Sequence, residues 1–181
     1  MYLMFLANGF EETEALVTLD LLRRAGIEAV TVGIGNDVID GTHGIRVYSD
    51  IREADICLEN CDGIILPGGM PGTENLYASK AVCDAVDFCA ENNKLICAIC
   101  AAPIILGRKG LLMGERAVCF PGFEDELSGA VIENVPCVKS GNFITAKGAG
   151  CVFEFSSEII SHIKGKEIAD EVIAVIQHKV F

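Results

Sequence analysis

The chain has 181 residues, of which 51% are hydrophobic, and carries a formal net charge of −12. This length fits a single domain over residues 1–181, and the acidic balance argues against nucleic acid or an anionic membrane as partner, because phosphate binding needs clustered Lys and Arg. No apolar run approaches the ~20 residues that span a bilayer, and the opening MYLMFLANGF lacks the basic start of a secretory leader. We therefore expect a cytoplasmic protein.

Strands and helices alternate along the chain. The apolar run YLMFLA ends at Asn8-Gly9 and predicts a buried strand, and the next segment has leucines near helical spacing with acids in its first turn. In chain order we expect strand 2–7, helix 10–26, strand 28–35, a hairpin over 37–50, strand 61–66, helix 75–93, strand 94–99, helix 101–110, strand 116–120, a paired-strand region over 131–148, and two helices over 151–180 broken near Gly165. This alternation predicts parallel βαβ units in an α/β sandwich, whose sites lie at the carboxyl ends of the strands. Three loops therefore matter: 8–14, 67–72 and 100–103.

The nine cysteines show no spacing typical of a disulfide framework, which indicates free thiols in a reducing compartment. Cys97 and Cys100 lie three residues apart in KLICAICAAP. On a strand they would occupy opposite faces with Cα atoms roughly 10 Å apart, beyond the ~7 Å that a disulfide allows. A zinc site shared with Cys57 and Cys61 lacks the usual knuckle turn residues. We favour neither alternative and expect Cys97 to pack in the core.

Cys100 ends the apolar run and is followed by Ala101, Ala102 and Pro103. Small residues permit a sharp strand-to-helix turn, and proline suits the first turn of a helix. A side chain on such an elbow is exposed at the edge of the sheet, beside a helix N-terminus that favours thiolate. We interpret Cys100 as a nucleophile with a pKa below ~8.5; a purely structural cysteine is the alternative.

The two other loops offer partners for this thiol. LPGGMPG exposes glycine backbone, and its N–H groups could bind a developing oxyanion together with that of Ala101. In the first loop, Glu11, Glu12 and Glu14 complement the helix dipole, or one of them is held protonated beside the thiol. The residue pattern alone does not choose among the three.

Four segments together, GFEETEA, ILPGGMPGTENL, ICAICAAP and TAKGAGCVFEFSSEII, resemble the ThiJ/PfpI family, and the parkinsonism-associated protein deglycase branch in particular. The resemblance implies a flavodoxin-like three-layer sandwich with a mostly parallel central sheet and helices on both faces. It places the reactive nucleophile on Cys100, the glutamate that hydrogen-bonds it on Glu14, and the oxyanion donors on Gly69 and Ala101. It also implies a homodimer, oxidation of the cysteine to the sulfinate, and glyoxalase, deglycase, chaperone and stress-protective activities. We expect no cofactor and no metal ion.

One position departs from the pattern of this branch, in which a histidine usually precedes the proline of the strand after the elbow helix. Here Phe120 precedes Pro121. His162 and His178 fall in predicted C-terminal helices, where a solvated surface role is expected. His43, in the hairpin, is either a plain turn residue or a substitute base from a partner subunit.

Two functions of different classes follow. The first is a Cys100-dependent glyoxalase or deglycase that acts on small carbonyl substrates such as methylglyoxal or their adducts, weakly, because the usual histidine is replaced. The second is an oxidative-stress sensor or chaperone-like protein in which Cys100 is oxidised rather than used for turnover.

Overall fold

The computed structural model of the chain describes residues 1–178, so the last two residues of the expected helical region 151–180 lie outside the described part. The strands are β1 (Tyr2–Leu6), β2 (Ala29–Gly33), β3 (Val38–Asp40), β4 (Arg46–Tyr48), β5 (Ile51–Arg52), β6 (Gly63–Leu66), β7 (Leu95–Ile99), β8 (Arg116–Ala117), β9 (Val131–Ile132), β10 (Cys137–Ser140) and β11 (Phe143–Ala146). The α-helices are α1 (Glu12–Arg24), α2 (Gly72–Ala78), α3 (Lys80–Glu91), α4 (Pro103–Arg108), α5 (Val152–Lys164) and α6 (Lys166–Val175).

Within residues 1–178, the central sheet has seven strands in the order β10-β11-β7-β6-β1-β2-β5. Every neighbouring pair is parallel except β10 with β11. Strands β6 and β7 are buried along their whole length. A parallel strand covered on both faces reads as a continuous apolar run, which is why GIIL and LICAI show no alternation of polar and apolar residues.

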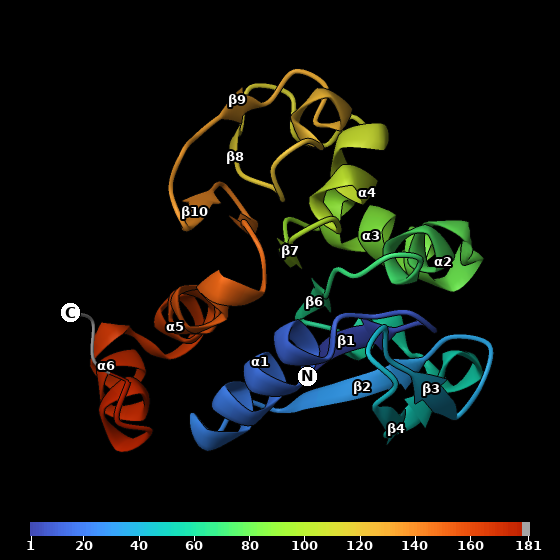
Figure 1. The fold of residues 1–181 in the computed structure, drawn as a ribbon, viewed down its shortest axis with the longest axis horizontal. Coiled ribbons are helices and arrows are strands. Elements are labelled where there is room, and N and C mark those ends of the chain that lie inside the picture. Colours follow the sequence, from blue (N-terminus) through green and yellow to red (C-terminus); the bar gives the residue numbers. More distant parts are fainter. Residues whose placement is uncertain (179–181) are drawn as a thin grey trace.

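Helices cover both faces of this sheet (Figure 1). Successive residues of a strand point to opposite faces, so β1 sends Phe5 into one core and Leu6 into the other. The first core includes residues of α3 and α4, and the second includes residues of α1, α5 and α6. The three-layer flavodoxin-like sandwich expected from the sequence is confirmed.

Some predicted elements differ in extent. The single helix expected over 75–93 is two helices, because Ser79 is extended and its hydroxyl accepts the Val82 N–H at 3.4 Å as the N-cap of α3. The strand expected over 116–120 is only β8, which pairs with β9 in a separate two-stranded sheet. The expected hairpin forms from β3 and β4. Among residues 1–178, no helix combines the length and apolar character needed to cross a membrane.

Candidate active site

The site lies where three neighbouring strands end. β1, β6 and β7 are adjacent and parallel, so their carboxyl ends meet at one edge of the sheet. The chain after β1 carries Glu14 on α1, the chain after β6 carries Gly68 and Gly69, and Cys100 follows β7 directly. The structure thus brings the residues predicted for the site together, because the Glu14 carboxyl and the N–H groups of Gly69 and Ala101 all interact with the Cys100 thiol.

Cys100 stands on a strained elbow. Its φ of 64° lies in the left-handed region, which costs a residue with a side chain about 1–2 kcal/mol. The surrounding backbone holds it there: the Cys100 N–H donates to the Ala146 carbonyl at 2.9 Å, and the Cys100 carbonyl accepts the Phe120 N–H at 2.8 Å. Pro103 then starts α4 three residues later. This is the strand-to-helix geometry that presents a nucleophile at the edge of a sheet.

Two glycines let the loop after β6 approach the thiol. A Cβ at Gly68 would lie 2.6 Å from the Cys100 Cβ and 2.8 Å from Oε2 of Glu14, which is closer than real side chains pack. Gly69 has a φ of 90°, and a Cβ there would lie 2.5 Å from the Glu11 nitrogen. Glycine at position 68 therefore lets the backbone approach Cys100 and Glu14, and glycine at position 69 lets it pack against the loop after β1.

Glu14 is the glutamate that reaches the thiol. Its side chain is buried, at 1% exposure, and Oε2 accepts the Gly68 N–H at 2.8 Å. Oε1 is buried without a partner in hydrogen-bond geometry. Burial raises the pKa of Glu14 to about 7, and the Gly68 N–H and the Cys100 thiol only partly offset this effect. A carboxyl with such a pKa can both accept and donate a proton near neutral pH.

The pKa of Cys100 moves in the direction opposite to the one expected from the sequence. Burial first, and then the Glu14 carboxylate, raise the pKa of Cys100 to about 12, although the N–H groups of Ala101 and Gly69 lower it. The expected thiolate-stabilising helix has only six residues, and burial and the Glu14 carboxylate outweigh its effect on the thiol. Near neutral pH the thiol therefore keeps its proton, while Glu14 is divided between its ionised and protonated forms, and the ionised form can accept the thiol proton.

Phe120 lies near the Cys100 sulfur, across Gly148. A Cβ at Gly148 would lie 3.3 Å from Cδ2 of Phe120 and 3.8 Å from Sγ of Cys100, so ring and sulfur flank the same glycine. The ring is 47% exposed and lies 6.4 Å from that of Phe123, measured between centroids. The Cys100 site therefore has an aromatic hydrocarbon wall on this side.

Phe120 stands where related proteins usually have a histidine, and none of the three histidines of this chain takes over that position. The His43 side chain is 69% exposed, and its Nδ1 lies 2.9 Å from Oε2 of Glu12. His162 lies on α5, and the ring of His178 stacks on Phe153 at 4.3 Å between centroids.

The remaining cysteines lie apart from this chemistry. All nine are free, and Cys97 is fully buried in the core, as predicted. Among residues 1–178, the cysteines form no cluster with metal-ligand spacing, so nothing gathers Cys57 and Cys61 with Cys97 and Cys100 into a zinc site.

A fourth loop, after β11, was missed by the sequence reasoning. β11 lies parallel to β7, on the side away from β6, so its carboxyl end reaches the same edge of the sheet. The Ala149 N–H helps to lower the pKa of Glu14, and Gly148 packs against the sulfur. The glycines of TAKGAG were the available signal, because they mark close backbone approach in the same way as those of LPGGMPG.

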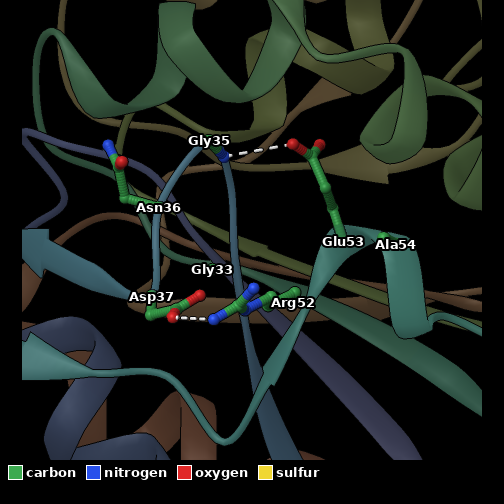
Figure 2. A pocket seen from close by; sticks show the side chains of 7 residues that line it. All are labelled: Gly33, Gly35, Asn36, Asp37, Arg52, Glu53 and Ala54. Atoms are coloured by element: carbon green, nitrogen blue, oxygen red, sulfur yellow. Dashed lines mark hydrogen bonds and ion pairs between the residues drawn. The ribbon is translucent and has the colours of Figure 1, made fainter.

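A separate polar pocket of about 340 Å³ lies at the carboxyl end of β2 (Figure 2). Its charged groups are already paired: Arg52 binds Asp37, and Glu53 accepts the Gly35 N–H at 3.2 Å (Figure 2). Its lining contains no cysteine or histidine. The nucleophile and its partners therefore lie elsewhere, at the ends of β1, β6, β7 and β11.

The sequence model of the DJ-1/PfpI family matches residues 2–162. The chain belongs to this family. The resemblance inferred from the four motifs is thereby confirmed.

Individual relatives agree with this assignment. Protein dj-1beta of Drosophila melanogaster is 32% identical over 173 residues, covering 94% of this chain and 92% of the relative. A Caenorhabditis elegans protein named glutathione-independent glyoxalase DJR-1.2 is 32% identical over 161 residues, covering 87% of this chain and 84% of the relative. The solved structure of oxidized Toxoplasma gondii DJ-1 superposes with a TM-score of 0.94 at 32% identity and covers 99% of this chain and 98% of that one. These comparisons support a DJ-1-type function for this member of the family.

Proposed function

We propose that this protein is a Cys100-dependent glyoxalase that converts methylglyoxal and related small α-oxoaldehydes into α-hydroxy acids without a cofactor. The observation that carries the proposal is the Cys100 thiol on its left-handed elbow beside Glu14, whose pKa is raised to about 7. A relative named as a glutathione-independent glyoxalase supports the choice of reaction. Residues Cys100, Glu14, Gly69 and Ala101 make up the proposed machinery.

In the first step, the sulfur of Cys100 attacks the aldehyde carbon of methylglyoxal. A carbon–sulfur bond forms, the thiol proton passes to the Glu14 carboxylate, and the carbonyl electron pair moves onto oxygen. The N–H groups of Gly69 and Ala101, which face the sulfur, can donate to that oxyanion. Because thiol deprotonation is coupled to attack, the raised pKa of Cys100 is compatible with reaction at neutral pH.

The second step is an internal redox exchange between the two carbonyl carbons. Glu14 returns its proton to the hemithioacetal oxygen, takes the hydrogen of the former aldehyde carbon as a proton, and delivers that proton to the neighbouring carbon, while the hydroxyl proton of the first carbon passes to the oxygen of the second. The first carbon becomes a thioester and the second an alcohol, so no external oxidant or reductant is needed. Water then cleaves the thioester to release lactate and restore the thiol; the sum is methylglyoxal plus water giving lactate.

Turnover is expected to be slow because the side chain at position 120 is a phenyl ring, which cannot carry protons. Within one chain, the proton transfers therefore depend on Glu14 and water. Cys100 could attack an adduct of methylglyoxal with a thiol or an amine in the same way. Attack on the carbon that came from the aldehyde would release the thiol or amine, which is the deglycase form of this reaction.

The alternative is a redox sensor in which peroxide oxidises Cys100. Two peroxide molecules would convert the thiol to the sulfinic acid and leave two molecules of water. A protonated Glu14 can donate a hydrogen bond to the sulfinate, and the Toxoplasma gondii relative is described as oxidized. The sulfinate yields of wild type and Glu14→Leu after mild peroxide, compared by mass spectrometry, test this role; equal yields would remove Glu14 from it.

Lactate formation from methylglyoxal separates the two functions. Wild type should form lactate and Cys100→Ser should not, whereas Cys57→Ser, which alters an exposed cysteine outside the site, should match wild type. Turnover that persists in Cys100→Ser would refute the glyoxalase proposal. Absence of turnover in wild type, with oxidation confined to Cys100, would favour the sensor.

We also propose that the protein is a homodimer. Ile45 and Tyr48, in the hairpin of β3 and β4, are 52% and 80% exposed, and a symmetric partner could cover such apolar surface. Light scattering at micromolar concentration should give the mass of two chains, and the mass of one chain would refute the dimer.

A further inference from the structure

A second cluster of ligand-type side chains lies outside the Cys100 site. It joins Glu11 and Glu12, at the start of α1, to His43 in the turn between β3 and β4. Oε2 of Glu12 lies 2.9 Å from Nδ1 of His43, and Oε2 of Glu11 lies 3.5 Å from the same nitrogen. The three ligand atoms all fall within 4.8 Å of one another.

These separations fit the coordination sphere of one small cation. Imidazole nitrogen and carboxylate oxygen bind zinc at about 2.0–2.2 Å, so two neighbouring ligands of one ion lie about 3.0–3.6 Å apart. Both distances from His43 Nδ1 lie close to this range. The Glu11 carboxylate is partly exposed and so has room to adjust its distance to the Glu12 carboxylate when a cation binds.

Glu12 is held in place before any cation arrives. It is buried, at 3% exposure, and its Oε1 accepts the N–H groups of His43 at 2.7 Å and Ile45 at 3.2 Å. Gly41 makes room for it, since a Cβ there would fall on the Glu12 carboxylate. These contacts orient Oε2 toward the imidazole, which is how outer hydrogen bonds prepare a ligating carboxylate.

We propose that Glu11, Glu12 and His43 bind a divalent transition-metal ion of the Zn²⁺ type. Two carboxylates and one imidazole neutralise the charge and supply donors that suit zinc, whereas Ca²⁺ requires six to eight oxygen ligands. In the metal-free protein, a proton joins Nδ1 of His43 to Glu12, and the cation replaces that proton. The site contains none of Cys100, Glu14, Gly69 and Ala101, so zinc binding there can be tested apart from the proposed glyoxalase activity.

Calorimetric titration of the reduced, metal-free chain with Zn²⁺ tests the site. One ion should bind per chain, and capping accessible thiols with iodoacetamide should leave this binding in place. Glu11→Gln and His43→Gln should each weaken it at least about tenfold, whereas His162→Gln should not. Both variants should fold, because the His43 side chain is exposed and Glu11 makes no side-chain cap bond.

The histidine ring signals in NMR provide a second measurement. Zn²⁺ should move the signals of His43 and leave those of His162 unchanged. Binding that survives Glu11→Gln and His43→Gln with unchanged affinity, or that thiol capping abolishes, would overturn the proposal and leave the contact between Glu12 and His43 as a brace of the hairpin.

Discussion

Two carboxylates in the first turn of α1, two residues apart and both almost inaccessible to solvent, have pKa values shifted in opposite directions. Glu12 is 3% exposed and Glu14 is 1% exposed. For Glu12, burial raises the pKa, but hydrogen bonds from the His43 ring and from backbone N–H groups outweigh it and leave the pKa below its ordinary value. For Glu14, burial prevails, with one backbone N–H in close contact, and raises the pKa to about 7.

The difference reflects both the depth at which each carboxyl lies, which sets the cost of its charge, and the partners that neighbouring loops supply. The turn between β3 and β4 supplies backbone donors and the His43 ring to Glu12, which favours its ionised form. The loop after β6 supplies Glu14 with one strong donor and places a thiol beside it. Glu14 therefore acts on protons, whereas Glu12 holds the hairpin and, as proposed above, a cation.

Removing the Glu14 carboxyl should have the largest effect. Loss of a positioned general base typically lowers the rate by about 10²–10⁴-fold, and we expect this loss of kcat/KM for methylglyoxal in Glu14→Leu and Glu14→Gln. Glu91→Gln, an exposed glutamate at the end of α3, is the control and should match wild type. A decrease of less than about threefold in both variants would show that another group moves the proton.

The stability of the protein should report the raised pKa of Glu14. Between pH 4.5, its ordinary pKa, and about 7, the unfolded chain has lost this proton while the folded chain retains it. Stability from this group is therefore complete below pH 4.5 and falls as pH rises to about 7. Urea unfolding should show wild type losing up to about 3 kcal/mol relative to Glu14→Gln across this window. A constant difference would contradict the raised pKa.

A glycine packs against each of the two carboxylates, Gly68 against Glu14 and Gly41 against Glu12, and substituting each glycine tests the two sites separately. Gly68→Ala places a methyl group against Cys100 and Glu14, and should cost about 1–3 kcal/mol of stability together with methylglyoxal turnover. Gly41→Ala presses on Glu12 and should weaken zinc binding instead. Gly33→Ala, which is overpacked against Ser49 at the end of β2, is the control that should lose stability but retain turnover. Full turnover in Gly68→Ala would show that the close packing there is dispensable.

Phe120→His should have the smallest effect and the opposite sign. The ring and the sulfur both lie close to Gly148, and the ring is 47% exposed, so an imidazole fits there with little loss of packing. We expect turnover at about pH 7 to rise roughly tenfold or more, because a positioned base would then assist Glu14. If the folded variant gains nothing and wild type is already fast, His43 of a partner subunit becomes the candidate, and His43→Ala is the next measurement.

Much of the fold could be predicted because apolar runs and turn residues are local signals. GIIL and LICAI are strands covered on both faces, and such strands need no partner information to be recognised. The break at Ser79 was missed because an N-cap serine inside a helical pattern resembles an ordinary surface position. Contacts between loops that follow different strands were harder to predict. The Ala149 N–H reaches Glu14 only because β11 lies beside β7 in the sheet.

The site was predictable in its residues and less so in its electrostatics. The small residues after Cys100 indicate an elbow, and the structure places a left-handed residue there. The direction of its pKa was predicted wrongly, because the sequence shows the helix that follows the thiol but not the carboxylate folded against it. The contact between Glu12 and His43 joins residues 31 positions apart and had no local signal at all.

The most direct test of the account is to titrate the glutamate side chains of the wild-type protein by carbon-detected NMR of the carboxyl groups. The account predicts that the Glu14 signal titrates near pH 7, while the Glu12 signal titrates below 4.5. Two carboxyls that both titrate near 4.5 would contradict it, because Glu14 would then have no special capacity to take the proton of Cys100 at neutral pH.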